Sequence, residues 1–573
     1  MTHLSRADLL VVGRIATLAG EAGLGWVEAL AVGEGRVLAA GPLAEVGVLV
    51  TRGTRWLRIP DGHVVAPAVT DAHIHFLEAA VTADEIDLEG TTTMEEALAI
   101  VARAHEARVR AGDRAGWLFG HGWLADRWGR LPAAGALEAV APGRPIALWA
   151  HDHHARWMSP AALAACGIDA GTPDPPGGMV GRDADGQPSG VLFEHATRIG
   201  VEAVPRPTSE RLAEAVVRHA DRLAALGIAG VHDPGATAPD PTLEGGLLVY
   251  RRLAAAGRLL LRVHAGVRDE QLETAVAAGL HSGEGVAPAD PGDPQARLSA
   301  ARFRVGWLKL FGDGSVGSRT AAMLEPYAAD PGGRAFPAGP RGRLLESRER
   351  MIERVTAAAE AGIATMIHAI GDGAVRTTLD AFAAVTAERL AGLPYRPRIE
   401  HAQLIHPDDV GRFGRLGVVA SLQPVQLRSD ETIMRRAWGD RTRHAFALAS
   451  LEATGGLLAF GTDAPVEPAD PWPGIAMAVT RQAAEWGDGV PPSTPEESIT
   501  LDRALRAATS GPWRAARDEL GGRLVAGSPA DLVVLDAAVI DEPVRPGGAL
   551  ALARPRLTLL DGEERYREAG FDA

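Results

Sequence analysis

The sequence contains one cysteine, Cys166, among 573 residues. A single thiol excludes an internal disulfide framework, so the redox compartment of the protein is not encoded by its cysteine content. Cys166 lies in the segment ALAACGI, where a small buried residue is the expected role. Any metal site in this chain must therefore be built from histidines and carboxylates.

Long apolar runs and a basic face are missing as well. No stretch of 18 or more apolar residues is present, so no membrane-spanning helix is expected. The segment MTHLSRADLLVVGRIATL lacks the basic region, apolar run and cleavage site of a secretory signal, which predicts a cytoplasmic location. The net charge of −15 argues against a nucleic-acid partner, because phosphate binding needs a concentrated basic surface.

The remaining composition is that of a globular enzyme. Hydrophobic residues make up 46% of the chain and charged residues 23%, and glycine and proline are spread along it. A chain of this length exceeds one small core, so one large domain with accessory domains is expected. The sequence leaves open whether the chain forms a homo-oligomer.

Both ends of the chain show the same pattern of short predicted strands separated by turns. DLLVVG, ALAVGEGRVLAAG and TRWLRIP near the start, and DLVVLDAAV and RPRLTLLDGE near the end, are apolar segments separated by glycine-containing turns. This pattern predicts a small β-sandwich domain assembled from residues 1–63 and 511–573.

Between these ends, short apolar strands alternate with Ala- and Leu-rich helical stretches. Such alternation favours a parallel sheet, and eight strands favour a closed (β/α)₈ barrel of the TIM type over residues 64–510. The eight predicted strands are 64–76, 227–233, 260–267, 303–311, 363–370, 398–404, 417–423 and 457–464.

The first and second of these strands are separated by about 150 residues, far more than one βα connection needs. We therefore expect a large insertion over about 77–226. An insertion after a barrel strand leaves from the carboxyl end of the barrel, so this one is expected to cover the active site and supply substrate contacts.

His73 and His75, in DAHIHF, are two residues apart on a predicted strand. Their side chains would point to the same face and could bind one metal ion. The pair alone is a weak signal in a chain with 18 histidines. Its position at the carboxyl end of an apolar strand, where barrel enzymes carry their catalytic groups, strengthens the interpretation.

Three further metal-type side chains follow later strands. His368 in TMIHAIGDG and His401 in RIEHAQL end the fifth and sixth strands, and Asp463 in AFGTDAPV ends the eighth. Each histidine taken singly is explained more simply as a hydrogen-bonded core residue. Jointly that explanation is poor, because chance does not place these groups at equivalent ends of four barrel strands.

Lys309, in GWLKLFGDGS, ends the fourth strand among apolar residues, where an ammonium group is costly to desolvate. One interpretation is a neutral amine that reacts with CO₂ and becomes a metal-bridging carbamate. The other is a lysine that extends to solvent or pairs with Asp313. Periodicity alone does not decide between these two interpretations of Lys309.

These residues resemble the amidohydrolase superfamily, whose members carry H-x-H on strand one, lysine on strand four, histidines on strands five and six, and aspartate on strand eight. The segments LKLFGDGSVGSRTA, IHAIGDGAV, RIEHAQL, GTDAPVEPADPW and GRLVAGSPADLVVLD are similar to amidohydrolase family 3, the branch that includes N-substituted formamide deformylase. The resemblance extends into the insertion through DHHARWMSPAAL and GRDADGQPSGVLFE. PAVTDAHIH departs from the usual PGF-type approach to H-x-H, and His153 stands where the branch usually has glycine.

The resemblance implies a metal centre with one or two ions. His73 and His75 would bind the first ion, His368 and His401 the second, a Lys309 carbamate would bridge them, and Asp463 would contact the first. Zn²⁺ suits imidazole and carboxylate ligands, although iron or manganese are alternatives. The metal would activate a water to hydroxide near neutral pH, and Asp463 would be the catalytic base and then acid.

The expected function is metal-dependent hydrolysis of an amide-type C–N bond, other than a peptide bond, in a small N-formyl or N-acyl compound. A cyclic-amide hydrolase, a deaminase, or a non-catalytic metal-binding barrel are the alternatives. Structural roles are at least as probable as substrate binding for each candidate substrate contact. These candidates are His121, His154, His232, Asp313 and Arg319.

Overall fold

The computed structural model describes residues 6–83, 85–150, 155–175, 178–205, 208–235, 242–317, 319–329, 339–487 and 489–573. The chain divides into two compact units. One unit consists of residues 1–79 together with 212–573, and the other consists of residues 80–211. The first unit holds a barrel and a terminal sheet, and the second holds the insertion.

Eight parallel strands form the barrel sheet of the first unit, and neighbours in the sheet are neighbours in the chain. Each of the eight segments predicted from the sequence contributes one of them, so the predicted (β/α)₈ barrel is confirmed. The strands are β6 (Val69–Asp71), β13 (Ile228–Asp233), β14 (Arg262–Arg268), β15 (Phe303–Phe311), β16 (Thr365–Ala369), β17 (Arg398–His401), β18 (Val419–Leu422) and β19 (Leu457–Phe460).

Backbone hydrogen bonds join the first and last strands of this sheet. The N–H of Ala72 donates to the carbonyl of Phe460 at 2.9 Å, and the N–H of Asp463 donates to the carbonyl of His73 at 2.7 Å. Gly461 lies at this seam, where an added Cβ would come within 2.4 Å of the backbone nitrogen of His73. Glycine therefore allows the ends of β6 and β19 to approach closely.

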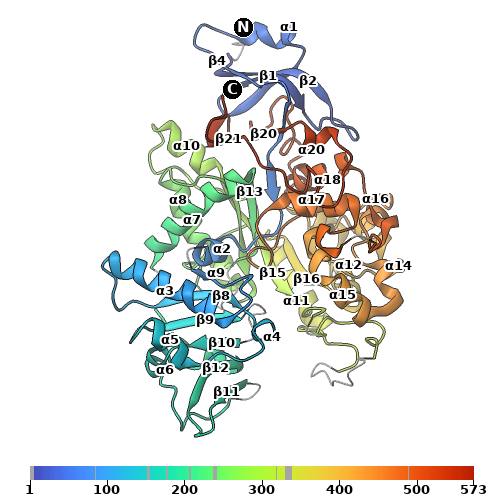
Figure 1. The fold of residues 1–573 in the computed structure, drawn as a ribbon. Helices are drawn as coiled ribbons and strands as arrows, with labels where there is room; N and C mark the ends of the chain where they lie inside the picture. Colours follow the sequence, from blue (N-terminus) through green and yellow to red (C-terminus); the bar gives the residue numbers. More distant parts are fainter. Residues whose placement is uncertain are drawn as a thin grey trace. The chain divides into compact units, whose positions relative to one another are not determined.

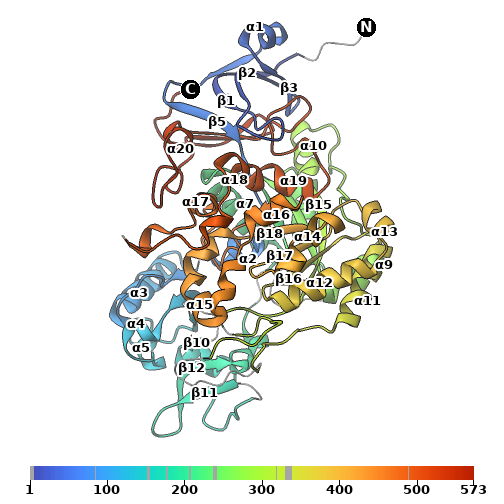
Figure 2. The same ribbon diagram turned by 90° about the vertical axis from the view of Figure 1, so that its right-hand side faces the viewer.

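Helices surround the barrel strands on their outer side (Figures 1 and 2). In α12, for example, Val375, Leu379 and Phe382 recur at helical spacing and are buried. The helices between or after barrel strands are α2 (Phe76–Thr82), α7 (Ser209–Ala225), α8 (Leu247–Ala255), α9 (Leu272–Ala277), α10 (Pro294–Ala301), α11 (Arg348–Glu360), α12 (Asp372–Ala384), α13 (Ala387–Gly392), α14 (Pro407–Leu416), α15 (Leu427–Trp438), α16 (Leu448–Ala453), α17 (Pro471–Thr480), α18 (Leu501–Ala508) and α19 (Ser510–Ala515).

A second sheet combines strands from both ends of the chain (Figure 1). Leu9 and Val11 point into one core with Leu532 and Val534, whereas Leu10 points into another, as expected for alternating faces of a strand. The order is β22-β21-β20-β5-β1-β2-β3, with β4 beside β1. The bounds are β1 (Leu9–Ala16), β2 (Trp26–Gly33), β3 (Arg36–Gly41), β4 (Arg55–Arg58), β5 (His63–Pro67), β20 (Leu532–Asp536), β21 (Leu557–Leu560) and β22 (Glu563–Arg567).

Buried ion pairs connect this terminal sheet to the barrel. Arg262 of β14 donates to Asp531 at 2.6 Å and also pairs with Asp561. Arg302, which precedes β15, donates to the other oxygen of Asp561 at 2.8 Å. The sheet built from the termini is therefore held to the barrel by paired charges as well as by the short segment between β5 and β6.

The insertion unit contains its own six-stranded sheet and core. Trp157 is fully buried, and its indole N–H donates to the carbonyl of Ala133 at 3.0 Å. The strands are β7 (Ile86–Asp87), β8 (Leu118–Trp123), β9 (Ile146–Ala150), β10 (Ala155–Met158), β11 (Gly178–Arg182) and β12 (Pro188–Glu194), and the helices include α3 (Met94–Arg110), α5 (Ala134–Val140) and α6 (Pro160–Ala165). That this unit covers the active site stays a prediction.

Within the described part of the chain, no helix has the length and apolar character that crossing a membrane requires.

Candidate metal centre

His73 and His75 follow β6 directly, although the sequence predicted them within the strand. The strand ends at Asp71 because its carboxylate accepts hydrogen bonds from the backbone N–H of His73 at 3.0 Å and of Thr462 at 3.1 Å. The two imidazole rings still lie together, with centroids 5.6 Å apart. Their expected proximity therefore arises from this turn rather than from strand alternation.

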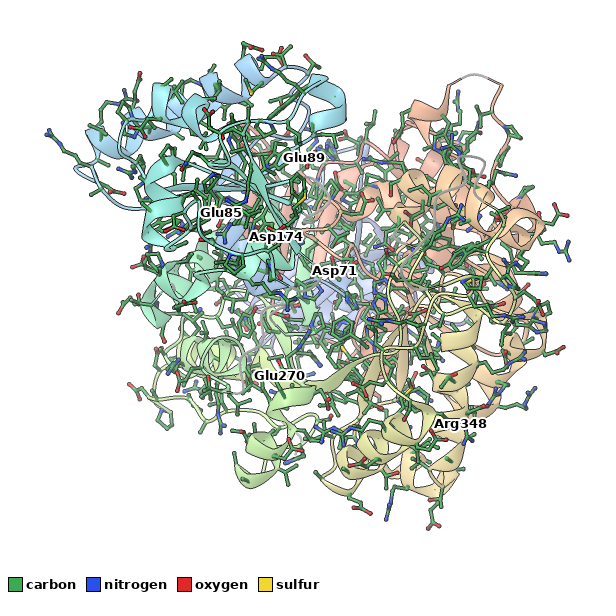
Figure 3. The ribbon with its side chains drawn as sticks, turned by 90° about the horizontal axis from the view of Figure 1, so that it is seen from below. Asp71, Glu85, Glu89, Asp174, Glu270 and Arg348 are labelled. Atoms are coloured by element: carbon green, nitrogen blue, oxygen red, sulfur yellow. The ribbon has the colours of Figure 1, made fainter. Side chains whose placement is uncertain are left out.

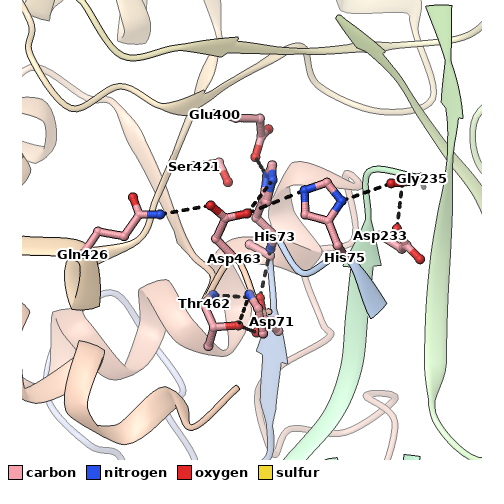
Figure 4. Close-up of polar contacts among 12 residues, drawn as sticks. Asp71, His73, His75, Asp233, Gly235, Glu400, Ser421, Gln426, Thr462 and Asp463 are labelled. Carbon is pink, nitrogen blue, oxygen red and sulfur yellow. Dashed lines mark hydrogen bonds and ion pairs between the residues drawn. The ribbon is translucent and has the colours of Figure 1, made fainter. Parts of the chain in front are cut away.

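Asp463 lies opposite these two histidines (Figure 4). Its Oδ1 is 3.5 Å from Nε2 of His73 and 3.7 Å from Nε2 of His75. One potential ligand atom from each of the three residues lies within 4.8 Å of the others. Asp463 has a φ of 63°, an unusual left-handed conformation for a non-glycine residue, as is often found at functional sites.

His368, the next-to-last residue of β16, and His401, the last residue of β17, complete the group of four histidines. Their rings lie 4.3 Å apart, and the ring of His401 lies 5.2 Å from that of His73. Parallel pairing places Ala369 opposite His401, which brings the ends of the two strands level. The structure thus gathers His73, His75, His368, His401 and Asp463, although they come from four strand ends spread over 390 residues of the chain.

Burial lowers the pKa of these histidines, so their rings are neutral at pH 7. The pKa falls to about 4 for His73 and about 3 for His368, and well below its usual value for His75 and His401. Desolvation is the largest cause for each ring. Neutral imidazole is the form that binds a metal ion.

Glu400 orients the ring of His73, a role that the sequence analysis did not predict. Its carboxylate contacts Nδ1 of His73 and accepts two hydrogen bonds from Arg398, at 2.7 and 2.9 Å. Both Glu400 and Arg398 are fully buried. A carboxylate on Nδ1 holds the ring so that Nε2 faces the site, as is typical around metal ligands.

This role of Glu400 was not predicted from the sequence, because side chains alternate along a strand and those of Glu400 and His401 were expected on opposite faces of the sheet. His401 has a φ of 70°, which breaks the alternation at the strand end, and both residues contact or approach His73. In the segment RIEH, Arg398 and Glu400 are two residues apart on a predicted strand and so share one face. Opposite charges on one face of a barrel strand were a signal that could have revealed the buried pair.

His75 is oriented by the backbone. Its Nδ1 lies 3.1 Å from the carbonyl oxygen of Gly235. The loop at Gly235 is held in turn by Asp233, whose carboxylate accepts from the N–H of Gly235 at 2.8 Å and from the hydroxyl of Tyr250. Nε2 of His75 is thereby left to face Asp463.

Lys309 is the only lysine in the chain, and its side chain is 1% exposed. Burial lowers the pKa of its amine, against the opposing effect of Glu400 and Asp463. The expectation of a solvent-extended lysine is excluded by this burial, and no ion pair with Asp313 occurs among the described residues. All other basic side chains apart from histidine are arginines, which cannot lose their proton in a protein. The presence of a single lysine is therefore another feature of the sequence that points to a special role for Lys309.

The donor set fits a metal ion. Nε2 of His73 is buried and has no hydrogen-bond partner within the described ranges, although it points toward Nε2 of His75 and Oδ1 of Asp463. Buried polar atoms are rarely left unpaired in folded proteins. The neutral imidazoles of His73 and His75 and the carboxylate of Asp463 match the ligands that Zn²⁺ and related divalent ions prefer.

Two of the candidate substrate contacts have structural partners. His232 is 1% exposed, and its Nδ1 accepts a hydrogen bond from Arg398 at 2.9 Å inside the barrel. Asp313 accepts backbone N–H groups of three residues and lies 3.7 Å from Nε2 of His368. These three donors are Ala322, Ile370 and Gly371.

The other three candidates are placed differently. Arg319 is 8% exposed and donates to the carbonyl of Ala328 at 2.9 Å. His121 lies on β8 of the insertion unit and is half-buried there. His154 and the neighbouring His153 lie outside the described residues. Substrate binding by the five candidates stays a prediction.

The family model that matches this chain is that of the amidohydrolase family, over residues 61–566. The chain belongs to the amidohydrolase family, as the resemblance implied.

The chain is also similar to other proteins along most of its length. The chain is 29% identical to Protein LONG AFTER FAR-RED 3 of Arabidopsis thaliana, covering 98% of this chain and 92% of that protein. It is 27% identical to N-substituted formamide deformylase of Arthrobacter pascens, covering 95% of each. An uncharacterised metal-dependent hydrolase from Pyrococcus furiosus has the same fold, with a TM-score of 0.72, 27% identity, and 92% and 98% of the two chains covered. Together with the family, these similarities support a hydrolase.

Proposed function

We propose that the protein hydrolyses an amide-type C–N bond in a small N-formyl or N-acyl compound, with a divalent metal ion held by His73, His75 and Asp463. The observation that carries this proposal is the convergence of Nε2 of His73, Nε2 of His75 and Oδ1 of Asp463, where Nε2 of His73 has no hydrogen-bond partner among the described residues. Similarity to a formamide deformylase supports the bond type.

The remaining ligands are proposed from the resemblance to the family. His368 and His401 would hold a second ion, and Lys309, as its carbamate, would bridge the two. A metal ion bound there would polarise the substrate carbonyl and acidify a water molecule. Zn²⁺ is the proposed ion because its preferred ligands are imidazole and carboxylate.

Asp463 is the proposed proton carrier. Burial raises the pKa of its carboxyl group above the usual value, so the group can accept a proton near neutral pH. It would take the proton from the attacking water at Oδ1 and deliver it to the leaving nitrogen, which must be protonated before the C–N bond breaks. Oδ2 is held by the side-chain amide of Gln426 at 2.9 Å and would keep the carboxylate in place.

The test is hydrolysis by chelator-treated protein and by the same protein reloaded with Zn²⁺, Mn²⁺ or Fe²⁺. The substrates are N-formyl amines, N-acyl amines, cyclic amides and amino-substituted heterocycles. We expect equal amounts of carboxylic acid and amine only from the metal-loaded protein, and a loss of roughly 10²- to 10⁴-fold in kcat for Asp463→Asn. Ammonia release from the heterocycles alone would indicate a deaminase, and no turnover with any metal would indicate a non-catalytic barrel.

A further inference from the structure

Arg268 is the last residue of β14, at the end of the barrel that carries the candidate metal centre. Parallel pairing places it directly opposite Lys309 on β15. Its side chain is largely buried, with 9% of the residue exposed. The sequence analysis assigned it no role.

Two nitrogens of this guanidinium have no hydrogen-bond partner in the part of the chain that the structure describes. Nε and Nη1 of Arg268 are both buried, and no described residue accepts a hydrogen bond from either. A guanidinium carries five N–H donors and never gives up its proton in a protein. Leaving such donors unpaired away from water is costly, so native structures usually supply a partner.

The nearby carboxylates do not fill this role. Glu270, labelled in Figure 3, has its Oε1 3.8 Å from Nε, beyond hydrogen-bond distance. Asp233 accepts its hydrogen bonds from Leu77, Gly235 and Tyr250 instead, and Asp269 pairs with Arg354 at 2.5 Å. Glu78 also acts on Arg268 through its charge.

The stem of Arg268 is packed so that its head group has a defined position. The guanidinium lies over the ring of Phe311 at 4.8 Å, and the amine of Lys309 lies over the same ring at 4.9 Å. Cδ and Cγ of Arg268 fill the space beside Gly235, where an added Cβ would come within 3.0 Å of both. Gly235 is the residue whose carbonyl orients His75.

We propose that Arg268 binds a carboxylate of the substrate, so that the preferred substrates are N-acyl compounds carrying an acid group, such as N-acylated amino acids. This inference rests on the proposed function and adds to it the substrate class. Hydrolysis of such a substrate consumes one water and releases a carboxylic acid and an amine that keeps the bound carboxylate.

A single negative charge suits this position better than a phosphate. Arg268 has four carboxylates in its surroundings, and these oppose the entry of a dianion. A carboxylate on one edge of the guanidinium can accept a charge-assisted hydrogen bond from Nε or from Nη1.

The experiment compares charged and neutral ligands in the metal-loaded protein. Calorimetric titration with butyrate and with butyramide measures binding without any hydrolysis. We expect the wild type to bind butyrate more tightly, and Arg268→Gln to lose about 10- to 100-fold of butyrate affinity while its butyramide affinity is unchanged. Direct contact of butyrate with the metal would occur equally in the wild type and in Arg268→Gln, so it cannot cause a difference in butyrate affinity between the two proteins.

Kinetics with N-acetylglycine and its neutral amide give the second readout. For Arg268→Gln, kcat/KM should fall about 10- to 100-fold for the acid and remain within about twofold for the amide. Arg251→Gln is the matched control, because Arg251 lies on α8 and pairs at 3.4 Å with Glu284, which is not one of the four carboxylates that act on Arg268. Arg268→Lys keeps the charge and should retain part of the preference for the acid, which also provides a measurement should the glutamine variant not fold.

The outcomes separate this inference from the proposed function. Butyrate binding that depends on Arg268, together with no hydrolysis of any amide, would support the anion site and contradict the proposed reaction. Hydrolysis with the same acid preference in wild type and Arg268→Gln would overturn the inference and leave the reaction standing. A wild type that does not distinguish butyrate from butyramide would overturn it as well.

Discussion

The side-chain amide of Gln426 donates a hydrogen bond to Oδ2 of Asp463 at 2.9 Å, and both residues are buried. The other oxygen of Asp463 is therefore left to face His73 and His75. Gln403 donates to Oε1 of Gln426 at 3.0 Å, which fixes which end of the Gln426 amide points at Asp463. The orientation of the proposed proton carrier is thus set by a short chain of amides.

Replacement of Gln426 by leucine should lower kcat with little effect on KM. The change removes the hydrogen bond to Asp463 but keeps the side-chain volume, so we expect a loss of roughly 10- to 100-fold. The measurement is steady-state kinetics on a substrate identified by the amide panel, with metal content determined in parallel. Gln482→Leu, which removes a hydrogen bond to Val490 instead, should change neither parameter. An unchanged kcat for Gln426→Leu would show that the amide does not position Asp463.

Replacement of Glu400 by glutamine should weaken metal binding. The change removes the carboxylate from Nδ1 of His73, which typically costs about 10- to 100-fold in metal affinity. It also leaves the buried charge of Arg398 without its partner, which should lower the free energy of unfolding by roughly 3–5 kcal/mol. Competition with a coloured chelator gives the affinity, and urea unfolding gives the stability.

A matched control for that change is Glu452→Gln, because Glu452 forms a partly exposed pair with Arg503 at 2.8 Å. Its loss should cost no more than about 1 kcal/mol and leave metal affinity unchanged. Equal metal affinity in Glu400→Gln and the wild type would contradict the proposed role of Glu400.

Replacement of Lys309 by alanine should remove one equivalent of metal and nearly all activity, because the bridging oxygens of the carbamate are lost. Lys309→Arg should behave in the same way, since a guanidinium cannot react with CO₂. Acetate should restore part of the activity of the alanine variant by supplying the missing oxygens. Full metal content and activity in Lys309→Ala would exclude the bridge.

The carbamate itself is open to direct measurement. Lys309 is the only lysine, so protein equilibrated with ¹³C-labelled CO₂ should give one lysine carbamate signal by NMR, and none in the alanine variant.

The contribution of the buried histidines to the stability of the metal-free protein should fall as the pH drops below about 6.5. Histidines titrate near this value in the unfolded chain, whereas burial lowers the pKa of His73 to about 4 and of His368 to about 3 in the folded protein. Between the two values the unfolded chain binds more protons, so protonation favours unfolding there, by up to ~1.4 kcal/mol per pH unit for each fully titrating group.

Urea unfolding of chelator-treated wild type and of His368→Gln at pH 7.5 and pH 5.0 measures this effect. The comparison of the two proteins removes the opposite contribution of buried carboxyl groups such as Asp463, whose pKa is raised to about 7. Above about pH 7 both states hold neutral histidines, and these groups should contribute no further change. The same pH dependence in wild type and His368→Gln would show that the His368 ring is not held in its neutral form by burial.

The barrel was predictable because its signals are local. Each of the eight segments has an apolar run of strand length and most are followed by a helical stretch, and this pattern depends only on neighbours in the chain. Ligand-type side chains at the ends of strands, such as His368 and His401, could be grouped for the same reason, since parallel strands bring their carboxyl ends to one edge.

Only the tertiary structure decided which side chains meet beyond those strand ends. Glu400 reaches His73 because the backbone turns at His401, and Gln426 reaches Asp463 from a helix that no strand pattern marks. The unpaired nitrogens of Arg268 are likewise a property of its packed surroundings. Periodicity determines which face of an element a residue lies on, whereas hydrogen-bond partners depend on distances between elements that are far apart in the chain.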